Sequence, residues 1–326
     1  MTQMRKVTLF LTLTLVIMLT VGGLCFGAGS FPTQPIQVIV PFSAGGATDL
    51  LARSVEKIWT KYSPQPMLVI NKPGAAGIMG TEYVVRSKPD GYTLLFGYGA
   101  GAHLIVPHLQ KLPYETFKDL VPVARLSIHS IVVCVGGKTP INSMKDLIAW
   151  EKAGNKVTAA VSGVGGSNDI TIKAVAKRAK INITSVPFEG GAPAITALAG
   201  GHLTIGVGQP SEVMPHILAG RFKAIGVALE SRDPAMPQIP TLREQGIDVS
   251  VWGAVMGTAA PAGTPPEVIE YLSSTLKKVC EDTGFKQIMD SLYQPIRYQN
   301  SKDFAAFLPT AHKDYGDLVR ELDIKM

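Results

Sequence analysis

Short runs of β-branched apolar residues alternate along this chain with longer stretches in which apolar residues recur every three or four positions. The run at 36–40 ends at Pro41 and is typical of a buried strand, and the stretch after it places Leu51, Val55 and Ile58 on one helix face. The same pattern predicts further strands at 67–70, 93–96, 123–135, 157–161, 183–187, 203–207 and 224–228. It predicts helices at 50–59, 78–86, 145–152, 170–178, 192–198, 268–279 and 302–321.

Several of these helices carry sequence signals for their first turn. Thr48 and Ser143 are expected to cap the helices that follow them, because a short hydroxyl side chain can accept from the free amides of a first turn. Thr264, with Pro265 and Glu267 after it, has the spacing of a capping box. We expect Ser301 to cap the closing helix and Pro309 to bend it.

The alternation of strands and helices predicts the α/β class, with a parallel or mixed sheet covered by helices. In such sheets ligands bind beyond the carboxyl ends of the strands. Glycine is concentrated at those ends, in the loops 42–48, 97–102, 162–169 and 188–192. Each loop opens a helix, and free amides at a helix start can hold an anion without Lys or Arg. The alternative is that each loop is only a tight turn.

The first thirty residues have the order of an export signal. Arg5 and Lys6 precede an apolar stretch at 7–26, and Gly27-Ala28-Gly29-Ser30 follows. We expect residues 1–30 to be cleaved, after Ala28-Gly29-Ser30 or Cys25-Phe26-Gly27, and the protein to be periplasmic. The apolar stretch is also long enough to span a bilayer, so an uncleaved anchor is the rival interpretation.

Composition narrows the classes that remain. The chain has 326 residues, of which 46% are hydrophobic and 17% charged, as in a folded protein long enough for two domains. The net charge of +6 is spread without a basic run, which argues against nucleic acid and suits a small anionic ligand. Cys134 and Cys280 lie in apolar segments, so we favour two buried free thiols over a bridge.

Motifs for catalysis and cofactors are weak in this sequence. Residues 97–102 fit the dinucleotide fingerprint only in its looser form and follow the third strand instead of the first. Residues 136–139 resemble the end of a Walker motif without its earlier glycine. No G-x-S-x-G or H-E-x-x-H pattern occurs, and His103 and His108 are a weak metal signal. We therefore expect no cofactor, no metal and no enzymatic activity.

Seven segments, in order, resemble the Bug (tripartite tricarboxylate transporter) family of solute-binding proteins. These segments are PIQVIVPFSAGGATD (35–49), NKPGAAG (71–77), PDGYTLL (89–95), VPFEGGAPA (186–194), GGH (200–202), IPT (239–241) and APAGTP (260–265). The resemblance covers about residues 33–322. It implies a type II-like periplasmic binding protein with two α/β lobes that close on a solute bearing a carboxylate. Lobe 1 would comprise 31–127 plus 253–326, and lobe 2 would comprise 128–252.

The resemblance also implies partners and a ligand site. The partners would be a small carboxylate solute and the membrane subunits of a tripartite tricarboxylate transporter, and the receptor would be a monomer. The expected contacts from lobe 1 are Phe42, Ser43, Ala44, Gly45, Gly46, Thr48, Asp49, Tyr98 and Gly99. The expected contacts from lobe 2 are Ser162, Gly163, Gly166, Ser167, Asp169, Glu189, Gly190 and Gly191.

Two acidic residues complicate the choice of solute. Glu189 stands where many relatives carry Lys, and Asp169 lies near a common His position. Each can contact an ammonium or hydroxyl of the ligand or cap the following helix. We therefore expect a mono- or dicarboxylate, with or without an amine, and not citrate. A sensor module for a membrane signalling partner and an exported enzyme on the same scaffold are the alternative functions.

Overall fold

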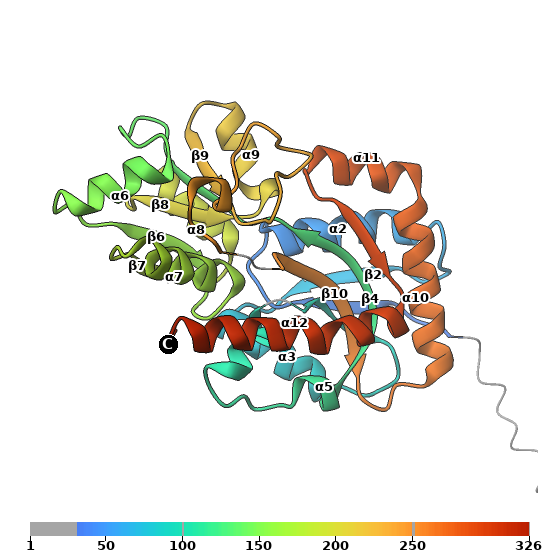
Figure 1. Ribbon diagram of the computed structural model, residues 1–326. Helices are drawn as coiled ribbons and strands as arrows, with labels where there is room; N and C mark the ends of the chain where they lie inside the picture. Colours follow the sequence, from blue (N-terminus) through green and yellow to red (C-terminus); the bar gives the residue numbers. More distant parts are fainter. Residues whose placement is uncertain (1–30, 100, 250–251, 326) are drawn as a thin grey trace, which may run out of the picture. The chain divides into compact units, whose positions relative to one another are not determined.

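Two mixed β-sheets, each flanked by helices, make up the computed structural model, which describes residues 31–99, 101–249 and 252–325 (Figure 1). We call the part built on the first sheet lobe 1 and the part built on the second sheet lobe 2. The first sheet contains β1 (Ile36–Val40), β2 (Met67–Asn71), β3 (Thr93–Tyr98), β4 (Leu120–His129), β10 (Ala254–Pro261) and β11 (Ile296–Gln299). The second contains β5 (Val132–Gly136), β6 (Thr158–Ser162), β7 (Thr184–Phe188), β8 (Ile205–Gly208) and β9 (Phe222–Val227).

The helices accompany these sheets in chain order. Lobe 1 carries α2 (Ala47–Trp59), α3 (Ile78–Val85), α4 (Gly101–Leu104), α5 (Thr116–Asp119), α10 (Pro266–Glu281), α11 (Thr283–Ser291) and α12 (Ser301–Glu321), with the 3₁₀ turns Ala75–Gly77 and Val106–His108. Lobe 2 carries α6 (Met144–Lys152), α7 (Ser167–Ala179), α8 (Gly191–Ala199) and α9 (Pro210–Leu218), with the 3₁₀ turn Arg243–Gln245. The predicted α/β class with two lobes is confirmed.

Both sheets combine a parallel part with an antiparallel part. The first sheet has the order β11-β4-β10-β3-β1-β2, in which β1 pairs in parallel with β2 and β3. The second has the order β7-β6-β8-β5-β9, in which β6 pairs in parallel with β7 and β8. Strand-to-helix loops leave the parallel strands at their carboxyl ends, so the Gly-rich loops of each lobe gather at one sheet edge.

The long strand predicted at 123–135 is wrong. The stretch forms β4 and β5, which belong to different sheets, with Ser130 and Ile131 between them. The chain crosses between the lobes here and returns between β9 and β10, and the Ser130 hydroxyl donates to the Asp233 carboxylate across the two crossings at 2.7 Å. Apolar periodicity continued through the crossing because both strands are buried. The predicted lobe boundaries at 127/128 and 252/253 stay predictions.

Strand β5 shows how alternation builds the core of lobe 2. Val132 and Cys134 pack in one hydrophobic cluster with residues of α8 and α9, whereas Val133 and Val135 belong to another cluster that includes α6 and α7. Because successive side chains of a strand point to opposite faces, a strand with helices on both faces is apolar throughout. Cys134 and Cys280 are both buried and free, as favoured from the sequence.

Three predicted caps are wrong and one is confirmed. Ser143 caps α6 by accepting from the Asp146 amide. The N-cap of α2 is Gly46, which puts Thr48 inside the first turn. The N-cap of α10 is Pro265, and the Thr264 hydroxyl donates to the Pro261 carbonyl. Asn300 caps α12 by accepting from the Asp303 amide, and the Ser301 hydroxyl donates to the Pro122 carbonyl.

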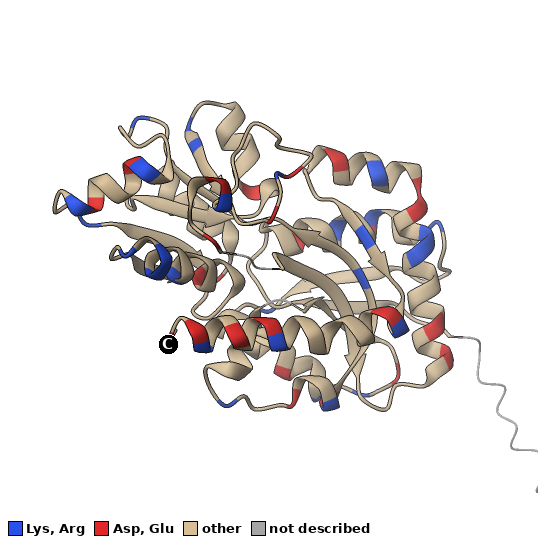
Figure 2. Cartoon of the chain, viewed as in Figure 1, with Lys and Arg blue, Asp and Glu red and all other residues tan. Residues whose placement is uncertain are grey.

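Charged residues lie mainly on the helices, and their signs are mixed along α10 and α12 (Figure 2). Helix α12 runs from lobe 1 to lobe 2, where Glu321 pairs with Arg178 and the Lys325 carbonyl accepts from Lys173 (Figure 1). The apolar stretch at 7–26 lies outside the described residues. Among the helices that the structure describes, none has the length and apolar character needed to cross a membrane.

Candidate functional site

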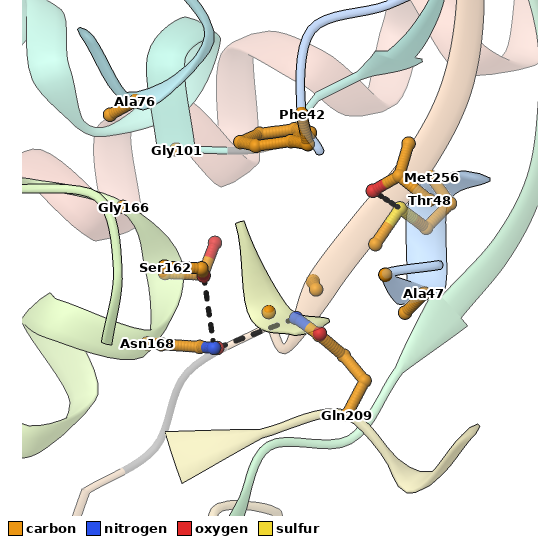
Figure 3. Close-up of a pocket in the computed structure, with 14 residues that line it drawn as sticks. Phe42, Ala47, Thr48, Ala76, Gly101, Ser162, Gly166, Asn168, Gln209 and Met256 are labelled. Carbon is orange, nitrogen blue, oxygen red and sulfur yellow. Dashed lines mark hydrogen bonds between the residues drawn. The ribbon is translucent and has the colours of Figure 1, made fainter. Parts of the chain in front are cut away.

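A cavity lies between the two lobes, at the carboxyl ends of their parallel strands (Figure 3). It is lined by residues of the loops after β1, β3, β6, β7 and β8, by the 3₁₀ turn after β2 and by β10. These lining residues are Phe42, Gly46, Ala47, Thr48, Ala76, Gly101, Ser162, Gly166, Ser167, Asn168, Gly191, Gln209, Ala254 and Met256. None of them is charged. The space open to the centre of a water molecule is about 30 Å³, so the lobes are nearly closed on the cavity.

The β1–α2 loop is held in place by hydrogen bonds to the side chain of Asp49. The Asp49 carboxylate accepts from the Gly45 amide at 2.9 Å, from the Asn71 side chain at 2.9 Å and from Arg53 at 3.0 Å. Burial opposes ionisation of Asp49, but these three donors outweigh it and lower the pKa of the carboxyl. Asp49 therefore stabilises the conformation of the loop and does not line the cavity. Phe42 and Thr48 of the same segment do line it.

Lobe 2 repeats this arrangement in the β6–α7 loop. The Asp169 carboxylate accepts from the Gly165 amide at 2.8 Å and pairs with Lys173 at 3.0 Å, as Asp49 does with Gly45 and Arg53. Asn168 donates to the Ser162 hydroxyl at 3.0 Å and to the Val207 carbonyl at 2.8 Å. Each lobe thus has one loop, leading into α2 or α7, that is braced by its own buried Asp and by a cation one turn later.

The two lobes touch directly around the cavity. Both the amide and the hydroxyl of Ser43 donate to the main-chain carbonyl of Glu189, at 3.1 and 3.0 Å. A Cβ added at Gly101 would lie 2.5 Å from the Cα of Gly166, so the backbones of α4 and α7 meet here. Only a residue without a side chain allows this approach.

A family model described as the tripartite tricarboxylate transporter family receptor matches residues 51–324. The chain belongs to this receptor family. The protein BugT of Bordetella pertussis is 31% identical to the receptor over 259 residues, which are 78% of each chain. The fold and the family predicted from the sequence are confirmed.

Solved structures with the same fold agree with this assignment. The periplasmic binding protein BugD is 27% identical to the receptor, with a TM-score of 0.84 over 90% of this chain and 99% of that one. MatC from Rhodopseudomonas palustris, solved with bound malate, is 28% identical, with a TM-score of 0.83 over 89% of this chain and all of that one.

Seven of the residues predicted as ligand contacts line the cavity of the receptor: Phe42, Gly46, Thr48, Ser162, Gly166, Ser167 and Gly191. The others, which are Ser43, Ala44, Gly45, Asp49, Tyr98, Gly99, Gly163, Asp169, Glu189 and Gly190, do not line it in this structure. Tyr98 is fully buried, and its hydroxyl donates to the Thr116 carbonyl. The Glu189 side chain is exposed. Contact of these ten residues with a solute stays a prediction.

Sequence reasoning missed seven lining residues, for two different reasons. Ala47, Ala76, Gly101 and Asn168 lie beside predicted contacts in the same loops or turns. Gln209, Ala254 and Met256 come from elements that the sequence pattern did not predict, namely the start of α9 and strand β10. The sequence did contain a signal for the start of α9. Pro210 and Glu212 follow a predicted strand with the spacing of a helix start.

Proposed function

We propose that this receptor binds a small metabolite with a carboxylate group in the periplasm and delivers it to the membrane subunits of a tripartite tricarboxylate transporter. The observation that carries the proposal is the uncharged cavity between two braced loops, β1–α2 and β6–α7, which is lined by the start of helix α7 at Ser167 and Asn168. Main-chain amides at a helix start bind anions without a cationic side chain. The malate bound to MatC, a protein with the same fold at 28% identity, supports the same class of ligand.

The proposal includes export of the chain, cleavage of residues 1–30 and action as a monomer. The positions of the cleavage sites lie outside the described residues, so the amino-terminal sequence of the protein purified from the periplasm tests that part. Binding itself requires the lobes to open and close, because the cavity as it stands holds little more than water. Such hinge closure is the usual motion of two-lobed binding proteins.

A thermal-shift screen of the purified protein against small carboxylates tests the ligand class. A solute present at 100 times its Kd stabilises the folded state by ~2.7 kcal/mol. For a chain of this size we expect that to raise the Tm by about 5 °C or more. Stabilisation by uncharged sugars or by amines, with no response to any carboxylate, would contradict the proposal.

A further inference from the structure

One carboxylate of the chain itself lies directly behind the cavity. Glu212, in the first turn of α9, is 8% exposed. Its Oε1 accepts from the Ala47 amide of lobe 1 at 2.9 Å, and its Oε2 accepts from the Gln209 amide of lobe 2 at 2.8 Å. Glu212 therefore already occupies the amide that begins helix α2.

The neighbouring helix start is blocked by the same side chain. A Cβ at Gly191, the first residue of α8, would lie 1.8 Å from Oε1 of Glu212, so the carboxylate rests against the backbone there. Gly46 and Ala47, at the start of α2, line the cavity together with Gly191. An anion that approached either helix start from the cavity would find the Ala47 amide already bonded to Glu212 and the Gly191 backbone covered by the same carboxyl group.

The Glu212 carboxyl group is not paired with a cation in the described part of the chain. Asp49 and Asp169, the other acidic residues bonded to the loops around the cavity, pair with Arg53 and Lys173. Glu212 has amide donors and no ion pair among the described residues. Burial raises the pKa of its carboxyl, because the two main-chain amides do not offset the desolvation. A ligand carboxylate beside Glu212 is repelled by the ionised group or requires Glu212 to bind a proton, and the Ala47 amide is already occupied, so a second ligand carboxylate enters this site only at a cost.

We propose that Glu212 determines the solute specificity of this receptor by acting as a built-in carboxylate at the start of α2, so that the cavity accepts a ligand with a single carboxylate and rejects dicarboxylates. This inference rests on the proposed function and narrows its ligand class. The start of α7, with Ser162 and Ser167, remains for the ligand carboxylate, and the end of the ligand next to Gly46 and Gly191 is uncharged.

Calorimetric titration with chain-matched pairs of ligands tests the inference. Butanoate is compared with succinate, and hexanoate with adipate, for the wild type, Glu212→Gln and Glu270→Gln. Glu270 is an exposed residue of α10, so its variant loses the same charge far from the cavity. We expect the wild type and Glu270→Gln to bind each monocarboxylate at least tenfold more tightly than its partner. Glu212→Gln should reduce that ratio at least tenfold, mainly by gaining dicarboxylate affinity.

A second variant tests the same site independently of the solute. Glu212→Ala leaves the Ala47 and Gln209 amides without their acceptor and opens space beside Gly191. Formate should therefore raise the Tm of Glu212→Ala more than that of the wild type. Equal formate effects in the two proteins would count against a carboxylate slot at this position.

The outcomes separate the inference from the proposed function. A wild type that binds succinate or adipate more tightly than its monocarboxylate partner overturns the inference alone, whether or not the variants fold. An unchanged ratio of monocarboxylate to dicarboxylate affinity in a folded Glu212→Gln variant also overturns the inference alone. If the wild type binds no carboxylate of any kind, the proposed function fails, and the inference fails with it.

Discussion

The contact between Gly101 and Gly166 allows closure of the lobes to be perturbed without disturbing either lobe. Gly101 begins α4, and its backbone lies outside the left-handed region, so alanine fits the local conformation. In the closed structure, however, the new Cβ would lie 2.5 Å from the Cα of Gly166 and 3.0 Å from the Ser167 nitrogen. Both atoms belong to the backbone of the opposite lobe, so neither can rotate away. Gly101→Ala should therefore act only when the lobes close.

The size of the effect follows from the cost of relieving that overlap. Carbon atoms without a bond between them pack at about 3.5–4.0 Å, so the loops must separate by roughly 1 Å. Adding a methyl group to a packed site costs about 1–3 kcal/mol. Because this cost falls on the closed state alone, it appears in ligand affinity at ~1.4 kcal/mol per tenfold. We expect the Kd to rise about 5- to 150-fold.

Calorimetry with the solute identified by the thermal-shift screen measures this Kd, and the Tm of the free protein monitors the fold. Gly136→Ala is the matched control, because its Cβ would meet only Thr139 at 3.6 Å and the residue lies in β5, away from the cavity. If Gly101→Ala binds the solute as tightly as the wild type with an unchanged Tm, the liganded lobes do not meet at this point. If the Tm of the free variant falls by an amount that corresponds to the same free energy as the loss of affinity, the substitution acts by destabilising the fold.

Three further predictions concern stability and reactivity. Burial lowers the pKa of His129 to about 3, so the unfolded chain takes up a proton on this side chain at a higher pH than the folded chain does. The free energy of unfolding therefore falls as the pH drops below ~6.5. In urea unfolding, His129→Leu should lose less stability than the wild type between pH 7.5 and 5, and an equal loss would contradict this assignment. Ser143→Ala removes the acceptor for the Asp146 amide and should cost about 1 kcal/mol, seen as a Tm lower by about 2–4 °C; an unchanged Tm would show that the cap contributes nothing. Cys134 and Cys280 are buried thiols with raised pKa values, so neither should react with a disulfide reagent until the protein is denatured; rapid labelling of the native protein would refute their burial.

The sequence pattern located most strands and helices of both lobes to within a few residues. Runs such as 36–40 and 157–161 are mostly apolar because helices cover both faces of their sheets. Such a run can therefore be identified as a buried strand from the sequence alone. The strand β10 was missed because its small residues, such as Ala254 and Gly257, carry little strand propensity. The hydroxyls of Thr48 and Ser301 bond instead to Met256 and Pro122, partners that the tertiary structure supplies. The Thr264 hydroxyl bonds to the Pro261 carbonyl three residues earlier in the chain.

The sequence predicted the chemistry of the candidate site, but it identified only part of the residues that line it. Glycine after a strand and before a helix indicates a close approach of the backbone, and seven such predictions line the cavity. Asp169 and Glu189 were considered as acidic groups that face the solute, yet Asp169 braces its own loop and the Glu189 side chain is exposed. The acidic residue behind the cavity is Glu212, whose position depends on how α9 meets α2 and α8.

The α/β class, the family and the position of the Gly-rich loops could be predicted from the amino-acid sequence, because each of these depends on neighbours along the chain. The pairing of the loops across the cavity, the point where the chain crosses between the sheets and the carboxylate at the start of α2 became known only from the three-dimensional packing. Those features join residues far apart in sequence, such as Ala47 and Glu212 or Ser43 and Glu189. No local periodicity encodes such a pair, because its two members are brought together only when both lobes have formed and packed.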